Sequence, residues 1–210
     1  MTRNLESAEA GAIAVTPGDD RFDRISIGLH WLTVLLIVIQ FASAWLRESV
    51  DHNSPIAVSL LMAHLDSGVL VWVVAVARLI WRHNFAYLPP FPPSMPKLQQ
   101  TIAKVNEYSL YVLLLVKPVT GLGRVLFRGR AFDLFFWQVP ALFEENDSIR
   151  HFLAESHEFG AKALLVLIGL HVGAALFHRL VLRDGVLQRM LPRTSARTKL
   201  TPILASDDAE

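Results

Sequence analysis

Long apolar stretches alternate with shorter polar segments along this chain. The clearest stretch, residues 25–45, contains no Asp, Glu, Lys or Arg over 21 positions. A helix of about 20 apolar residues crosses the hydrocarbon core of a bilayer, which is about 30 Å thick. Spans are expected at about residues 25–45, 60–81, 105–127 and 159–182. The pattern therefore predicts an all-α fold, an integral membrane four-helix bundle.

The remaining segments are predicted to be tails and connections around this bundle domain, residues 21–193. Residues 1–20 are small, polar and partly acidic, as in a cytoplasmic tail rather than a cleavable signal. Residues 87–97 contain five prolines and should form a stiff extended connection. Residues 128–156 are predicted to be the longest internal loop, with an aromatic run in the membrane interface. Residues 194–210 form the predicted C-terminal tail.

Basic residues predict the orientation of the bundle. Four spans place both termini on one side of the membrane, and that side collects most of the 20 Lys and Arg residues. Loops rich in Lys and Arg remain in the cytoplasm. Both termini are therefore predicted to be cytoplasmic.

Composition limits the chemistry. The chain is 52% hydrophobic and 19% charged, and its net charge of +1 gives no basis for nucleic-acid binding. It contains no cysteine, which excludes disulfides, thiolate zinc sites, iron–sulfur clusters and covalently attached c-type haem. A metal cofactor would have to be held by His, Met, Asp or Glu.

Four histidines lie in or beside the apolar stretches at positions suited to haem iron. His157 and His171 share the fourth stretch, and fourteen helical steps place them near one stripe, about 21 Å apart in height. His30 and His64 lie in the first and second stretches. By depth, His30 should pair with His171 near the cytoplasmic side, and His64 with His157 near the outer side. Intramembrane histidines should face the bundle interior, so two depth-matched pairs predict two bis-histidine haems stacked across the membrane.

Two alternatives stay open for these side chains. If no cofactor binds, each histidine is a buried, hydrogen-bonded packing residue. In addition, His178 follows His171 by seven residues, so it lies on the same helix face and competes with it as the inner ligand.

Cations near the histidines are candidate partners for haem propionates. On the inner side the candidates are Arg24, Arg78, Arg82 and Arg179. An outer patch, which either steers a small anion or neutralises propionates and lipid phosphates, comprises Arg124, Arg128, Arg130, Arg150 and Lys162. Lys117 interrupts the third span just before Pro118, which should kink that helix. Its amine either pairs with a propionate, Asp66 or a quinone oxygen, or extends toward the outer face.

Several motifs resemble those of one known family, the prokaryotic cytochrome b561 family, over about residues 21–193. The matching segments are RISIGLHW at 24–31, HLDSG and RLIWR within 64–82, LYVLLLVKPVTGL at 110–122, and SHEFGAKALLVLIGLHVGAALFHRLVLRDGVLQRMLPR at 156–193. The last is the most specific. Within the family, the chain looks like the branch that contains superoxide oxidases of bacterial inner membranes.

The resemblance implies a multi-pass protein of the bacterial inner membrane with two non-covalent haem b groups. It implies axial ligands at His30, His64, His157 and His171, and quinone as a partner. In the similar branch, superoxide is oxidised at the periplasmic side and quinone is reduced, as a superoxide:quinone oxidoreductase would do. The alternative is an electron-transfer subunit of a larger respiratory dehydrogenase or hydrogenase, with a redox partner protein. A small membrane protein without cofactor is the remaining hypothesis.

The chain departs from the family pattern near the predicted outer site. Lys117 stands before the proline where the family usually has an apolar residue. Asp66 lies two positions after the predicted ligand His64, and a negative charge there would oppose the attraction of superoxide.

Overall fold

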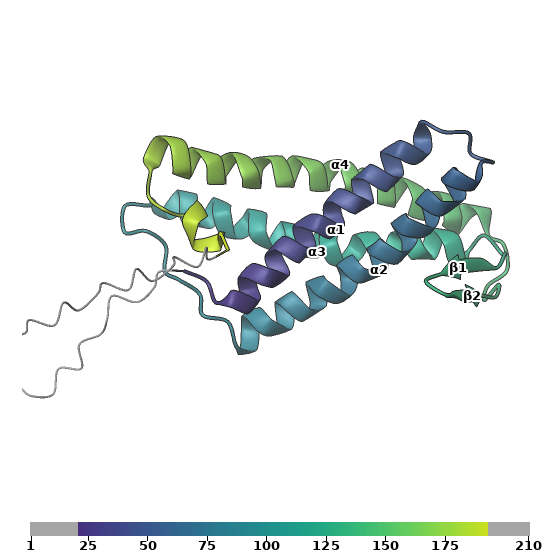
Figure 1. Cartoon of the computed structure of the whole chain (residues 1–210), viewed down its shortest axis with the longest axis horizontal. Coiled ribbons are helices and arrows are strands. Elements are labelled where there is room, and N and C mark those ends of the chain that lie inside the picture. Colours follow the sequence, from purple (N-terminus) through teal and green to yellow (C-terminus); the bar gives the residue numbers. More distant parts are fainter. Residues whose placement is uncertain (1–20, 193–210) are drawn as a thin grey trace, which may run out of the picture.

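Four long helices, running alternately in opposite directions, form the molecule in the computed structural model, which describes residues 21–192 (Figure 1). Their bounds are α1 Arg24–Glu48, α2 Pro55–Asn84, α3 Lys97–Leu126 and α4 Asp147–Phe177. All four are long and apolar enough to cross a membrane. The prediction of an all-α membrane four-helix bundle is confirmed.

Capping residues explain where the helices begin. The side chains of Asp23, Ser54 and Asn146 accept hydrogen bonds from main-chain amides three residues ahead, at 2.9, 3.2 and 3.0 Å. Hydropathy alone misses such starts, because a capped polar turn is helical whether or not it is apolar. Helix α4 therefore begins at Asp147, inside the segment predicted to be a loop.

Packing joins the helices as two hairpins. Close main-chain approaches link α1 to α2 and α3 to α4, and α2 also packs on α3. The buried core between them is small, and it comprises Leu36, Val71, Ala75 and Leu114. Large apolar side chains cover the outside of the helices, for example Val38 at 57% exposure. A bundle that faces lipid tails has this distribution.

The two ends of the described chain meet at one end of the bundle, called here the terminal end. Arg21 donates to the main-chain carbonyls of Gln188 and Leu191, both over 2.8 Å. Helix α4 leads there through a π-helical turn, His178–Leu182, and a 3₁₀ turn, Leu187–Met190. The predicted tails lie outside the described residues.

A β-hairpin covers the opposite end, called here the hairpin end (Figure 1). Strands β1 (Phe132–Leu134) and β2 (Trp137–Val139) pair antiparallel. The amide of Phe135 donates to Asp66 Oδ1 over 2.7 Å, and Phe135 itself adopts a left-handed conformation, φ 54°. Phe136, at 99% exposure, and Trp137, at 77%, project outward. The segment predicted to be a loop therefore contains both this hairpin and the first turns of α4.

Candidate functional site

The four predicted ligand histidines come together as two pairs. At the terminal end the ring centres of His30 on α1 and His171 on α4 lie 6.2 Å apart. At the hairpin end the ring centres of His64 on α2 and His157 on α4 are also 6.2 Å apart. The ring planes are inclined by 56° and 71°. One helix therefore contributes a histidine to each pair, and two other helices contribute one histidine each.

The separation within each pair fits one metal ion between two imidazoles. A metal–imidazole bond is about 2.0 Å long and a ring nitrogen lies about 1.1 Å from the ring centre, so two opposite ligands should have centres about 6.2 Å apart. Both pairs have this spacing, which is too long for a direct hydrogen bond between the rings. The donor set therefore fits bis-histidine haem.

Each pair also bridges helices that are not close neighbours. Among residues 21–192 the most extensive close approaches between the long helices join α1 to α2, α3 to α4 and α2 to α3. The terminal-end pair instead joins α1 to α4, and the hairpin-end pair joins α2 to α4. Histidines paired across such helices leave room for a flat group between those helices.

Main-chain acceptors orient both rings at the hairpin end. Nδ1 of His64 donates to the carbonyl of Gln40 over 3.1 Å, and Nδ1 of His157 donates to the carbonyl of Lys117 over 3.0 Å. A carbonyl only accepts, so the proton lies on Nδ1 and Nε2 keeps its lone pair. Ligand histidines in metalloproteins are usually oriented in this way.

The terminal-end pair is held differently. Nδ1 of His30 is buried and has no hydrogen-bond partner within residues 21–192. The ring instead meets the edge of Trp31, with ring centres 5.7 Å apart, and Trp31 Nε1 donates to the carbonyl of Met190 over 2.8 Å. Packing rather than a carbonyl acceptor therefore positions His30.

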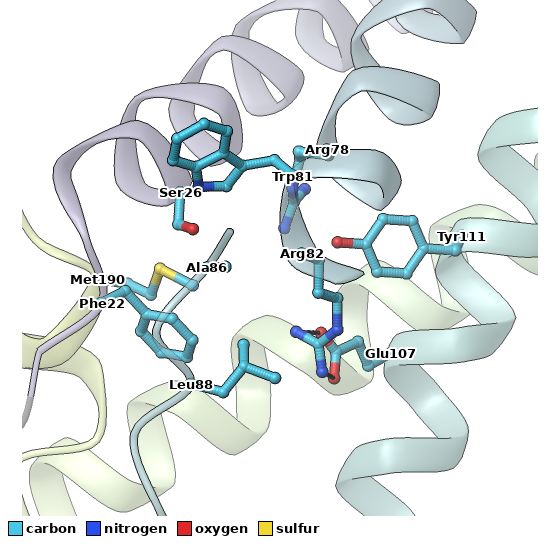
Figure 2. Close-up of a pocket in the computed structure, with 10 residues that line it drawn as sticks. All are labelled: Phe22, Ser26, Arg78, Trp81, Arg82, Ala86, Leu88, Glu107, Tyr111 and Met190. Carbon is cyan, nitrogen blue, oxygen red and sulfur yellow. Dashed lines mark hydrogen bonds and ion pairs between the residues drawn. The ribbon is translucent and has the colours of Figure 1, made fainter. Parts of the chain in front are cut away.

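Of the four propionate candidates, Arg78 is the one whose positive charge acts on both rings of the terminal-end pair. Its guanidinium lies 5.3 Å from the ring centre of Tyr111, beside a small cavity that both residues line (Figure 2). Arg82 lines the same cavity but forms an ion pair with Glu107 over 2.7 Å (Figure 2). Arg24 and Arg179 are exposed, at the start of α1 and in the π-helical turn.

Among residues 21–192, the ring of His30 is paired with the ring of His171 and not with that of His178. The side chain of His178 is buried, at 7% exposure, and its Nδ1 lies 2.5 Å from Oδ2 of Asp184. This contact closes the π-helical turn. The geometry therefore favours His171 over His178 as the partner of His30.

Lys117 and Asp66 both bind main-chain groups of this chain. The Lys117 amine donates to the carbonyl of His157 over 2.5 Å, and Asp66 accepts from the amide of Phe135. Gln40 is not among the residues predicted from the sequence, although it binds His64 in the same way that Lys117 binds His157. An amide side chain inside the apolar stretch 25–45 was the signal for it.

Arginines gather at the hairpin end. Partial burial lowers the pKa of Arg128, and the positive charges of neighbouring arginines lower it further. Those neighbours are Arg124, Arg150, Arg47 and Arg130. Within the outer patch, Arg150 is paired with Asp147 and Lys162 with Glu158. Arg47, which is not part of the predicted outer patch, joins the cluster from the end of α1.

Comparison with known proteins shows the family of this chain. The model of the family described as prokaryotic cytochrome b561 matches residues 21–193. The chain belongs to this family. Its members bind haem b and act in membrane electron transport, so this is a bacterial membrane cytochrome.

Relatives share nearly their whole length with this cytochrome b561 family member. Cytochrome b561 homolog 1 of Escherichia coli (strain K12) is 31% identical over 174 residues, 83% of this chain and 98% of the relative. The probable superoxide oxidase CybB of Yersinia pestis is 29% identical over 177 residues, 82% of this chain and 97% of the relative. Cytochrome b561 homolog 2 of Escherichia coli (strain K12) is 27% identical, over 88% of this chain and 98% of the relative.

Proposed function

We propose that the protein is a diheme cytochrome b that carries electrons across the bacterial inner membrane between a periplasmic donor and quinone. The observation that supports two haems is the pair of histidine sites at opposite ends of one bundle, each with ring centres 6.2 Å apart. His30 and His171 would hold one haem, and His64 and His157 the other.

The terminal end is assigned to the cytoplasm. Within residues 21–192 it carries nine Lys and Arg residues and the hairpin end carries five, and basic residues remain preferentially on the cytoplasmic side. The nine are Arg21, Arg24, Arg78, Arg82, Lys97, Lys104, Arg179, Arg183 and Arg189. The hairpin end then faces the periplasm, and its exposed Phe136 and Trp137 suit the membrane interface. Lipid would surround the apolar outer faces of the four helices.

Bound haem b would supply a one-electron carrier at each site. The residues of the chain contribute orientation and charge. The carbonyls of Gln40 and Lys117 fix the imidazoles of His64 and His157 with Nε2 available. At the terminal end Arg78 would balance a propionate, whereas Arg82 is already engaged by Glu107. Two imidazoles on one iron favour electron transfer over oxygen binding.

Superoxide is the proposed donor. One relative is named as a probable superoxide oxidase, and the arginine cluster of the hairpin end would attract an anion. Asp66 keeps its negative charge while it accepts from the Phe135 amide, so it opposes this attraction, but the five arginines of the cluster outnumber it. Two superoxide ions would each lose one electron, which gives two molecules of O₂. Quinone takes up these two electrons with two protons and becomes quinol.

Two measurements on purified protein test this function. The haem-to-protein ratio should be about two, and superoxide should reduce the haems in stopped-flow spectra, with quinone accepting the electrons. A protein without a Soret band contradicts the haem assignment. A diheme protein that superoxide does not reduce, and that co-purifies with a catalytic partner, would instead be an electron-transfer subunit of a dehydrogenase or hydrogenase.

A further inference from the structure

Lys117 reaches across the interface between α3 and α4 to bind the backbone of a haem-ligand candidate. Its Nζ donates to the main-chain carbonyl of His157 over 2.5 Å. The aliphatic part of the side chain lies against Gly160, where a Cβ atom would come within 2.8 Å of Lys117 Cδ. Gly160 is buried. A glycine at this position therefore leaves space for the lysine to reach the carbonyl.

The same short segment of α3 holds the imidazole of His157. The Lys117 carbonyl accepts from Nδ1 over 3.0 Å and from the Thr120 hydroxyl over 2.9 Å. The Thr120 hydroxyl also lies 3.2 Å from Nδ1. The ring rests against Gly121, where a Cβ atom would come within 2.8 Å of its Cε1. Both the backbone and the ring of His157 are thus fixed by residues 117–121.

An equivalent arrangement occurs between α1 and α2. The Gln40 carbonyl accepts from Nδ1 of His64 over 3.1 Å, and the Gln40 side chain donates to the His64 carbonyl over 2.6 Å. Ser43 follows Gln40 by three positions, as Thr120 follows Lys117, and its hydroxyl lies 3.3 Å from Nδ1 of His64. Gly68 lies beside the Gln40 side chain, because a Cβ atom at Gly68 would come within 3.3 Å of Gln40 Nε2.

These contacts form two copies of one hydrogen-bonding arrangement, on the helix pairs α1–α2 and α3–α4. In each copy a residue on the preceding helix accepts from the ligand's Nδ1 through its carbonyl. Through its side chain, that residue also donates to the ligand's own carbonyl. A hydroxyl one turn later and a glycine on the ligand helix complete each copy. Lys117 occupies the place of Gln40, which identifies its amine as a hydrogen-bond donor at this position.

We propose that Lys117 is a positioning residue for His157: its side chain fixes the backbone of α4 and so the orientation of the imidazole toward His64. This rests on the proposed function, because it takes His157 as a haem ligand. Glutamine retains a donor, as Gln40 shows, whereas methionine has similar length and no donor. The two substitutions therefore separate the hydrogen bond from side-chain volume.

The experiment compares the full-length wild type with Lys117→Gln, Lys117→Met and the control Lys97→Met. Lys97 is exposed at the start of α3, the helix that carries Lys117, and lies at the terminal end. Electron paramagnetic resonance (EPR) of the oxidised protein reports imidazole orientation through the position of each low-spin signal, and a redox titration gives each midpoint potential. The hairpin-end signal is the one that His64→Ala removes.

Lys117→Met should shift or broaden the hairpin-end signal and change its midpoint potential. Lys117→Gln should keep the wild-type signal position, and Lys97→Met should leave both signals unchanged. The terminal-end signal serves as an internal check that each variant is folded. Gly160→Ala, which crowds the lysine stem, is a second variant and should shift the same signal as Lys117→Met.

A normal wild type whose hairpin-end signal stays in place in both Lys117→Met and Gly160→Ala overturns the positioning role alone. The role is also overturned if Lys117→Gln changes the signal as much as Lys117→Met. A wild type without a bis-histidine signal at the hairpin end overturns the diheme proposal, and the positioning role with it.

Discussion

Gln40 and His64 bind each other twice across the interface between α1 and α2. His64 Nδ1 donates to the Gln40 carbonyl over 3.1 Å, and Gln40 Nε2 donates to the His64 carbonyl over 2.6 Å. The same Nε2 lies 2.8 Å from the Ser67 hydroxyl. One amide group therefore holds two consecutive turns of α2 near a haem-ligand candidate.

Gln40→Leu should destabilise the hairpin-end site, because it leaves partly buried acceptors on α2 without their donor. The expected cost is about 1–3 kcal/mol. It would be measured as a lower midpoint of thermal unfolding in detergent, followed through haem absorbance. Gln138→Leu, on the exposed strand β2, is the matched control and should leave the midpoint unchanged. Equal midpoints for the two variants would contradict the role of Gln40.

Single histidine variants should sort into two groups. If the proposed function holds, His30→Ala and His171→Ala should lose the terminal-end haem, and His64→Ala and His157→Ala the hairpin-end haem, because the two histidines of each pair would hold one haem together. The haem-to-protein ratio, measured by pyridine haemochrome, should fall from about two to about one in each case. The control is His178→Ala, which should keep both haems because His178 binds Asp184. Loss of different spectral components in His30→Ala and His171→Ala would contradict the pairing.

The sequence predicts the histidine pairs because their depths follow from helical rise and span direction. His157 and His171 share one helix, so only the direction of the other spans was needed to find partners at equal depth. The bonds of Gln40 and Lys117 could not be predicted in this way. They depend on which helices are adjacent and on how each helix is rotated about its axis.

Local geometry explains the other differences between sequence and structure. The start of α4 at Asp147 depends on a single cap, Asn146, whose side chain accepts from the amide of Ile149. The hairpin depends on Phe135 in a left-handed conformation, which is uncommon for a residue with a bulky side chain. Asp66 on α2 holds Phe135 by accepting a hydrogen bond from its amide. Hydropathy carries no information on either feature.

Arg78→Gln should lower the midpoint potential of the terminal-end haem. Removing a cation near the site destabilises the reduced form, by an amount on the order of 60 mV, which corresponds to a tenfold change in a one-electron equilibrium. Redox titration with optical detection would measure it. Arg24→Gln, at the exposed start of α1, should cause a smaller change. A larger shift in Arg24→Gln would assign the propionate contact to Arg24 instead.

Asp66→Asn should loosen the hairpin. The variant replaces a charged acceptor of the Phe135 amide by a neutral one, and hydrogen bonds to charged groups are the stronger kind, at about 1.5–3 kcal/mol. Limited proteolysis in nanodiscs should show faster cleavage within residues 130–140. Asp133→Asn, an exposed position on β1, is the control and should be cut at the wild-type rate. Equal rates in the two variants would mean that the hairpin is held by its other contacts.

The contact between His178 and Asp184 should make the terminal end sensitive to acid. Burial acts to raise the pKa of Asp184, but hydrogen bonds from His178 and from the Val186 amide outweigh it and hold the pKa below its ordinary value. A depressed carboxyl pKa contributes stability that is complete above the unfolded value, about 3.9, and is lost as the pH falls through the folded value. Asp184→Asn should therefore be less stable than the wild type at pH 7, and the difference should shrink below about pH 4.

The unfolding midpoint of each protein in detergent, measured from pH 7 down to pH 3, tests this. Asp51→Asn, in the exposed turn between α1 and α2, is the control, and its curve should run parallel to that of the wild type. A difference between wild type and Asp184→Asn that stays constant with pH would show that the Asp184 carboxylate does not stabilise the fold through its charge. The contact would then contribute through shape and neutral hydrogen bonding, which asparagine largely preserves.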